Sequence, residues 1–139
     1  MYGRQKRSKY GSRKVHFAGM TFDSTLEYER WLYLSDLERQ HKIRNLERQT
    51  PFVLIEDVTG TREKQLKTKT RTETYVIEKG CRYLADFTYE KPVGDDWVCV
   101  IEDTKSEATR KKESYVIKRK LMRVHGNVVR EVMRATEEI

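Results

Sequence analysis

Three residues near the middle of the chain combine two carboxylates with a lysine at a spacing that could do chemistry. Asp86 lies within one strand-like apolar run, and Asp103 and Lys105 close the next such run. Side chains two apart in a strand share a face, so Asp103 and Lys105 project together and Glu102 points away. Asp86 can face Asp103 if the register of the two strands permits.

The chemistry expected of this set is metal-assisted hydrolysis of a phosphodiester. Two carboxylates can hold Mg²⁺, which prefers oxygen ligands and keeps several waters, and Mn²⁺ is expected to substitute. The metal would lower the pKa of a bound water and neutralise charge on the phosphate. Lys105 would stand beside that water or a phosphate oxygen as a point charge. The carbonyl of Thr104 is a further candidate ligand. By itself, however, an Asp-x-Lys strand is also typical of a surface salt bridge.

A helix expected from about Thr25 to His41 carries a third acid. Ser24 and Glu27 have capping-box spacing. Apolar residues gather on one face of this helix, namely Leu26, Tyr33, Leu34 and Leu37. Glu27 lies at the edge of that face, whereas Glu29 and Asp36 fall on the solvent side. Glu27 is therefore either a metal ligand that completes the site or only a helix cap.

Two further charged residues fall where burial is expected. Arg30 lies within the apolar stripe of the helix, which is costly unless it finds a carboxylate or covers the stripe with its methylenes. Glu27, three residues back, is one candidate partner. Glu102 is either a buried structural ion pair or a member of the site, if a bulge shifts the register.

The remaining patterns predict an α/β (α+β) fold with a mixed sheet flanked by helices, in a single domain over residues 15–139. Strands are expected around residues 15–22, 52–55, 74–78, 81–89, 97–101 and 128–132. The run 97–101 is continuously apolar, as in a strand covered on both faces. Residues 59–74 are predicted to form a long polar hairpin connection. A second helix is expected from Thr109 to about Val124, with Ile117, Leu121 and Val124 facing inward.

The charge balance indicates a polyanionic partner. The 139 residues include 29 Lys and Arg against 22 Asp and Glu, a net charge of +7. Most of this excess lies in residues 1–14, a basic N-terminal arm that suits DNA because each cation near a phosphate releases counterions. Solubility alone would also explain the arm, and a solvated loop would explain basic residues 59–74 equally well. The residues expected to contact nucleic acid are Arg4, Lys6, Arg7, Lys9, Lys67, Lys69, Lys111, Lys112 and Lys118.

No membrane or disulfide signature accompanies this pattern. No apolar run reaches the roughly 18 residues that span a bilayer, and no apolar segment follows the basic start. A cytoplasmic protein is therefore expected, in the host cell if a phage encodes it. Cys81 and Cys99 are isolated in strand-like runs, which predicts reduced, buried thiols and no structural zinc.

The order of these motifs resembles the PD-(D/E)xK nuclease superfamily, in which an acid on the first helix precedes Asp…Asp-x-Lys on a hairpin and then a helix. Over residues 15–124 the chain is similar, more narrowly, to small phage and prophage proteins related to phage endonuclease I, which resolves Holliday junctions. The motifs that carry this resemblance are Phe22–Glu27, Gln49-x-Pro51-Phe52, Tyr83-x-Ala85-Asp86-Phe87 and Ile101–Lys105. Ala85 stands where the superfamily name places Pro, and Ser106 stands where Gly is more usual.

The resemblance implies a restriction-endonuclease-like fold, with Asp86 and Asp103 as metal ligands, Lys105 as the catalytic lysine and Glu27 as the helix-borne acid. The expected function is a metal-dependent DNA endonuclease, with branched DNA as substrate and a homodimer as the working form by analogy alone. The alternative is a non-catalytic DNA-binding module with the same fold, although an acidic cluster would repel phosphate. A small RNA- or protein-binding domain is the third interpretation, and it predicts no dependence on divalent metal.

Overall fold

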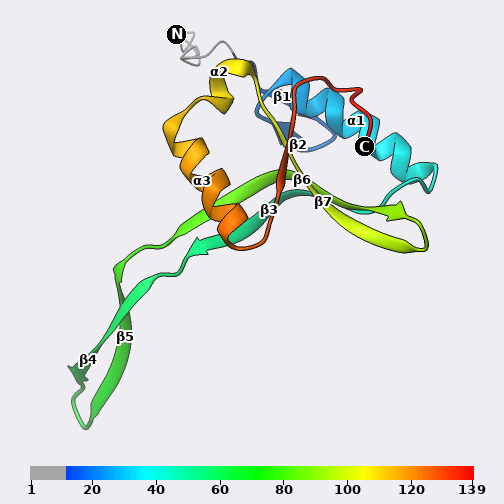
Figure 1. Ribbon diagram of the computed structural model, residues 1–139. Helices are drawn as coiled ribbons and strands as arrows, with labels where there is room; N and C mark the ends of the chain where they lie inside the picture. Colours follow the sequence, from blue (N-terminus) through cyan, green and yellow to red (C-terminus); the bar gives the residue numbers. More distant parts are fainter. Residues whose placement is uncertain (1–11) are drawn as a thin grey trace.

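A four-stranded sheet with the strand order β3-β6-β7-β8 organises the protein, whose structure, a computed structural model, describes residues 12–139 (Figure 1). The elements are β1 Val15–Phe17, β2 Met20–Phe22, α1 Thr25–Arg39, β3 Arg44–Ile55, β4 Val58–Gln65, β5 Thr70–Glu78, β6 Cys81–Val93, β7 Asp96–Thr104, α2 Glu107–Arg110, α3 Glu113–Val124 and β8 Val129–Val132. Strands β3, β6 and β7 pair antiparallel, and β8 joins β7 in parallel. The predicted α+β class, with a mixed sheet flanked by helices, is confirmed.

Helix α1 starts where the capping pattern predicts. The backbone N–H of Glu27 donates to Oγ of Ser24 at 3.1 Å, which satisfies one of the free donors of the first turn. The helix ends at Arg39, two residues earlier than predicted, because His41 takes a left-handed conformation with φ of 58°. Its buried Leu34 and Leu37 pack with residues that include Ile43, Phe87 and Tyr89.

The predicted second helix is two helices. Ser106 caps the short α2 by accepting a hydrogen bond from the N–H of Thr109 at 3.2 Å. Lys112 is then extended, with φ of −61° and ψ of 129°, so the chain changes direction before α3. A helical pattern across residues 109–124 does not show this break, because no Gly or Pro marks it.

The buried face of α3 was predicted incorrectly. Tyr115 and Met122, seven residues apart and therefore on one face, are buried in the core that contains Leu54, Tyr83, Ala85 and Ile101. Leu121 packs at the edge of this core, as expected. Ile117 and Val124 are 51% and 79% exposed, respectively, because they lie on other sides of the helix.

The outer end of the β6–β7 hairpin is not covered on both faces, contrary to expectation. Trp97, Val98 and Cys99 are exposed, and only Val100 and Ile101 of the apolar run reach the cores. The reason is the length of the neighbours. Strand β3 pairs with β6 only as far as Glu90, and β8 pairs with β7 only from Ile101. The prediction of a buried thiol is therefore wrong for Cys99, and Cys81 is half-buried.

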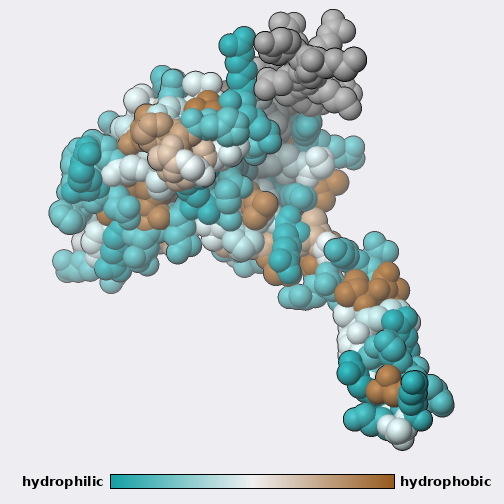
Figure 2. All heavy atoms as spheres, turned by 180° about the vertical axis from the view of Figure 1, so that it is seen from behind, coloured by the Kyte–Doolittle hydropathy of each residue, from teal (hydrophilic) through white to brown (hydrophobic). Residues whose placement is uncertain are grey.

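Residues expected to form a polar connection are instead two long strands. Strands β4 and β5 pair with each other from Val58↔Glu78 to Gln65↔Thr70 and form a sheet of their own. This hairpin projects away from the body of the molecule (Figures 1 and 2). At its base, the N–H of Gly80 donates to the Asp57 carboxylate at 2.7 Å. A Cβ at Gly80 would lie 2.0 Å from the carbonyl oxygen of Ile55, so the close approach of these two backbone segments needs glycine here.

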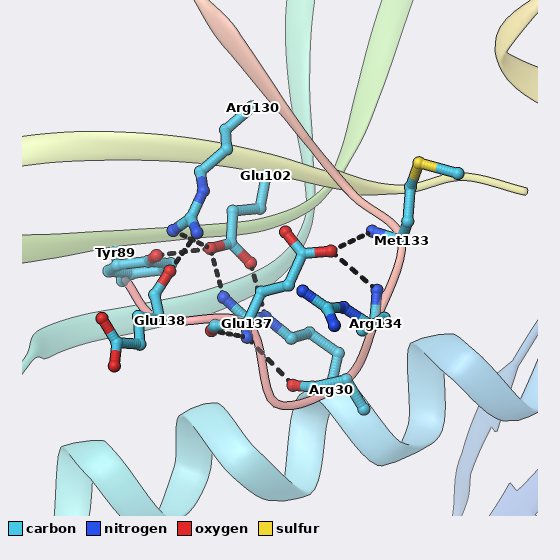
Figure 3. A network of polar contacts seen from close by, with 9 residues as sticks. Arg30, Tyr89, Glu102, Arg130, Met133, Arg134, Glu137 and Glu138 are labelled. Carbon is cyan, nitrogen blue, oxygen red and sulfur yellow. Dashed lines mark hydrogen bonds and ion pairs between the residues drawn. The ribbon is translucent and has the colours of Figure 1, made fainter. Parts of the chain in front are cut away.

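A buried ion pair joins α1 to β7 (Figure 3). Arg30 and Glu102 are both 0% exposed, and the guanidinium donates to the carboxylate twice, at 2.9 Å from Nε and 2.6 Å from Nη2. Tyr89 and Arg130 complete the shell of Glu102. Arg30 therefore pairs with Glu102 and not with Glu27. Of the two roles predicted for Glu102, the structure shows the buried structural ion pair.

The same network ties down the end of the chain. Nη1 of Arg30 donates to the carbonyl oxygens of Ala135 and Glu137, at 2.9 and 2.5 Å. Arg130 donates to the carbonyl oxygen of Glu138 (Figure 3). With the two bonds to Glu102, the guanidinium of Arg30 makes four hydrogen bonds, which offset the cost of burying its charge.

Two further expectations concern the ends and surroundings of the chain. Residues 12–14 are exposed and outside any helix or strand, and the rest of the predicted basic arm lies outside the described residues. None of the helices in residues 12–139 has both the length and the apolar character needed to cross a membrane.

Candidate active site

The β6–β7 hairpin brings Asp86, Asp103 and Lys105 together. Phe87 pairs with Glu102, so the same register carried one residue further sets Asp86 opposite Asp103. Asp86 Oδ2 accepts hydrogen bonds from the N–H and the hydroxyl of Thr104, at 2.8 and 2.7 Å. Lys105 Nζ lies 3.1 Å from Asp103 Oδ2. The two carboxylates thus come from neighbouring strands, and Lys105 follows directly after the end of β7.

Asp103 is a buried carboxylate whose surroundings leave it short of positive charge. It is 2% exposed, and its Oδ2 accepts a hydrogen bond from the Tyr83 hydroxyl. Its Oδ1 has no hydrogen-bond partner among the described residues. Burial, followed by the negative charge of Asp86, raises the pKa of Asp103 to about 7, and Lys105 and Tyr83 only partly oppose this.

The side-chain amide of Gln49 connects Glu27 to Asp86. Its Oε1 accepts from Gln49 Nε2 at 3.2 Å, and the same Nε2 lies 3.4 Å from Asp86 Oδ1. Gln49 has φ of 52°, a left-handed conformation within β3 that marks local strain. Burial, and then the charge of Asp86, raise the pKa of Glu27.

Glu27 also serves the start of α1. Its Oε2 accepts from the N–H of Asp23 at 2.8 Å, one residue before the cap and not at the cap itself. Arg48 Nη2 lies 3.5 Å from its Oε1. Within residues 12–139, no group of three or more His, Cys, Asp and Glu side chains is arranged to hold a metal ion. The metal role of Glu27 therefore stays a prediction.

Lys105 lies against an aromatic ring. Its ammonium is 4.8 Å from the centroid of Tyr115, within the range of a cation–π contact. The Tyr115 hydroxyl donates to Glu131 at 3.1 Å, and Glu131 also pairs with Arg110 and Arg119 at 3.0 and 2.7 Å. A chain of contacts thus connects the lysine to basic residues of α2 and α3.

Those basic residues line a cavity of about 500 Å³. Arg110, Arg119, Lys120 and Arg123 contribute to its wall, together with Glu131. One carboxylate against four cations leaves an excess of positive charge, which suits an anionic ligand such as a phosphodiester backbone.

The residues predicted to contact nucleic acid are spread over three places. Lys67 and Lys69 lie in the turn of the β4–β5 hairpin, and both are exposed. Lys111 and Lys112 lie between α2 and α3, and Lys111 pairs with Glu107 at 3.2 Å. Lys118 is half-buried on α3. The remaining four, Arg4, Lys6, Arg7 and Lys9, lie outside the described residues.

Sequence reasoning missed several residues that shape the site. Tyr83 is three positions before Asp86, so simple alternation assigns it to the opposite face and conceals its bond to Asp103. Gln49 belongs to a motif of the resemblance, yet its role as a bridge depends on a positive φ. Tyr115 and the hydroxyl of Thr104 gave no recognisable signal at all.

Comparison with known proteins adds a family. A family model described as "Protein of unknown function (DUF1064)" matches residues 7–136. The chain belongs to this family. The DUF1064 match covers every residue of the site just described. No curated protein and no solved structure matches the chain.

Proposed function

We propose that this DUF1064 protein is a metal-dependent endonuclease that hydrolyses phosphodiester bonds of DNA. The observation that carries the proposal is the buried Asp103, which has an unpartnered Oδ1 beside Asp86 and Lys105. A structural aspartate buried to this extent would be expected to have both oxygens satisfied. A divalent cation beside this oxygen would satisfy it and would offset the repulsion from Asp86 that helps to raise the pKa of Asp103.

The donor set fits a hard divalent cation, with Mg²⁺ expected and Mn²⁺ as a substitute. Asp86 and Asp103 would hold it through carboxylate oxygens, which are the ligands that Mg²⁺ prefers. When bound, the ion would supply an activated water and neutralise charge on the phosphate. Glu27 is the third acid in reach of the same region, through Gln49.

The side chains around the carboxylates have positioning roles. Thr104 fixes one oxygen of Asp86 with two hydrogen bonds, which leaves Oδ1 turned toward Gln49. Tyr83 holds Asp103 by Oδ2, and Oδ1 is thereby left available. These bonds set the carboxylates before substrate arrives, so little reorganisation is needed on binding.

Lys105 is the residue proposed to act on the reacting groups. Its ammonium is held between the Asp103 carboxylate and the ring of Tyr115, so its long side chain has few alternative positions. In that place it can stabilise a phosphate oxygen or orient a nucleophilic water as a point charge.

DNA is proposed as the substrate because of charge and resemblance. The chain carries +7, and the cavity next to Tyr115 is lined mainly by cations. The proposals that branched DNA is the substrate and that the protein works as a homodimer rest only on the similarity to phage endonuclease I. A non-catalytic DNA-binding module is the competing proposal, and it gives no purpose to the buried Asp103 and the half-buried Asp86 beside it.

The test is cleavage of supercoiled plasmid and of a synthetic four-way junction, with Mg²⁺, with Mn²⁺ and with EDTA. Metal-dependent cleavage is expected, and Asp86→Asn, Asp103→Asn and Lys105→Met should each abolish it. Asp95→Asn is the matched control, because it makes the same chemical change in the exposed turn of the same hairpin.

Two outcomes would contradict the proposal. Cleavage that survives in Asp86→Asn and Asp103→Asn would remove this site from the reaction. Tight DNA binding with no cleavage of either substrate under any metal would favour the non-catalytic module.

A further inference from the structure

The β4–β5 hairpin, here called the arm (residues 58–78), sorts its side chains onto two faces. Directly opposed residues share a face, and faces alternate along each strand. One face carries the opposed pairs Arg62↔Glu73 and Lys64↔Arg71, preceded by Tyr75. We call this the basic face. The other face carries the opposed pairs Thr59↔Val76, Thr61↔Thr74, Glu63↔Thr72 and Gln65↔Thr70.

The inner end of the basic face is neutralised within the arm. Arg62 Nε donates to Glu73 at 2.7 Å, and the guanidinium lies 4.9 Å from the ring centroid of Tyr75. Gly60 gives this ring room, since a Cβ there would lie 3.2 Å from it. This part of the arm is a self-contained support for the strands.

The cations at the outer end of the arm, in contrast, are not neutralised within it. Within residues 12–139, no ion pair or side-chain hydrogen bond engages Lys64, Arg71, Lys67 or Lys69. Lys64 and Arg71 are directly opposed, an arrangement of like charges that destabilises a sheet. From residue 61 to 72 there are five basic residues and one acidic residue, so the local charge is +4.

The arm therefore holds an exposed cationic ribbon at a cost in stability. A two-stranded hairpin without further strands or a covering helix is only marginally stable in water. The arm has neither, because β4 and β5 pair only with each other (Figure 1). Its distal part is mainly hydrophilic (Figure 2), so burial against the body does not explain it.

We propose that the arm is a binding ribbon for double-stranded DNA, which lays its basic face in the major groove. A two-stranded ribbon fits the major groove, which is about 12 Å wide. Eight residues of β4 extend for about 26 Å at the usual rise per residue, or about seven to eight base pairs. Lys64 and Arg71 then lie at the groove, with Lys67 and Lys69 at the tip near phosphates.

A hydrogen bond links the two chain segments that connect the arm to the body. Asp57 accepts from the N–H of Gly80, and these two residues lie on either side of the arm's first pair. A ribbon held in this way can set where duplex DNA lies relative to β6 and β7. The inference rests on the proposed function only for the choice of DNA as the polyanion.

The experiment measures binding of a 30-base-pair duplex by fluorescence anisotropy across a salt series in EDTA. All proteins carry Asp86→Asn, so cleavage does not interfere. In the arm variant, Lys64, Lys67, Lys69 and Arg71 are all replaced by Thr, which keeps a high strand propensity. The slope of log affinity against log salt should become shallower by roughly 3 to 4, and affinity at low salt should fall roughly 10- to 100-fold.

A relocation variant distinguishes the effect of the basic face on binding from the effect of net charge. It combines Lys64→Thr and Arg71→Thr with Thr61→Lys and Thr74→Arg, which moves an opposed cation pair to the other face. It should bind duplex as weakly as Lys64→Thr with Arg71→Thr alone. Far-UV circular dichroism and a thermal melt check that each variant is folded.

The outcomes are separable from those of the cleavage test. Unchanged affinity and slope in the arm variant would overturn the arm's role, and so would full recovery in the relocation variant. Equal losses for single-stranded DNA of the same length would overturn the duplex assignment. Loss of duplex binding in the arm variant, in a protein that cleaves nothing, would support the arm and refute only the nuclease.

Discussion

Replacement of Asp103 by Asn should stabilise the metal-free protein, and the gain should depend on pH. The side chain is 2% exposed, and burial with the nearby charge of Asp86 raises its pKa from 3.8 to about 7. Between these values the native state binds more protons than the unfolded state, so the free energy of unfolding falls as pH rises. Asparagine does not ionise and escapes this loss.

The magnitude follows from the shift. About three pKa units correspond to a loss of at most about 4 kcal/mol, nearly complete by pH 8 and only about 0.5 kcal/mol at pH 4. Asp103→Asn should therefore be more stable than the wild type at pH 8, by up to that amount, and should lose most of this advantage at pH 4. In a chain of this size, each kcal/mol moves Tm by about 3 to 6 °C.

Urea unfolding in EDTA, followed by circular dichroism at pH 4, 6 and 8, is the measurement. Asp95→Asn, in an exposed turn, should differ from the wild type by less than about 0.5 kcal/mol at every pH. A difference between Asp103→Asn and wild type that does not change with pH would refute the reasoning. Mg²⁺ should also raise the Tm of the wild type and leave that of Asp103→Asn nearly unchanged.

Three further predictions concern the frame that holds the site. Glu102→Gln leaves the guanidinium of Arg30 buried without a counter-charge, and should lower the free energy of unfolding in urea by about 3–5 kcal/mol; a loss below 1 kcal/mol would contradict this. Gly80→Ala places a Cβ 2.0 Å from the carbonyl oxygen of Ile55. The free energy of unfolding from a thermal melt should therefore fall by about 1–3 kcal/mol. An unchanged Tm would show that the two backbone segments can move apart freely. Ser24→Ala removes the cap of α1 and should cost about 1 kcal/mol in the same melt, whereas Ser24→Asp should restore most of it.

Local patterns in the sequence were sufficient for several parts of the molecule. Ser24 and Glu27 marked the first turn of α1, because capping involves residues only three apart. Alternation along one strand placed Asp103 and Lys105 on one side and Glu102 on the other, and their partners agree with this. The hairpin that brings Asp86 beside them also follows from two adjacent apolar runs and a turn.

Long-range packing decided what these patterns left open. Arg30 and Glu102 are 72 positions apart, and only the approach of α1 to β7 brings them together. The inner face of α3 depends on where the sheet lies, so Met122 is buried and Val124 is exposed although both are apolar.

The sequence by itself determined α1, the β6–β7 hairpin and the side of β7 on which Asp103 lies, because hydrogen-bond spacing and side-chain alternation are local properties. The tertiary structure alone decided that Asp103 Oδ1 is left unpartnered and that Gln49 bridges Asp86 to Glu27. It also decided that the basic residues between 59 and 74 lie on a paired two-stranded hairpin. The physical reason is that burial and desolvation are set by neighbours from distant parts of the chain.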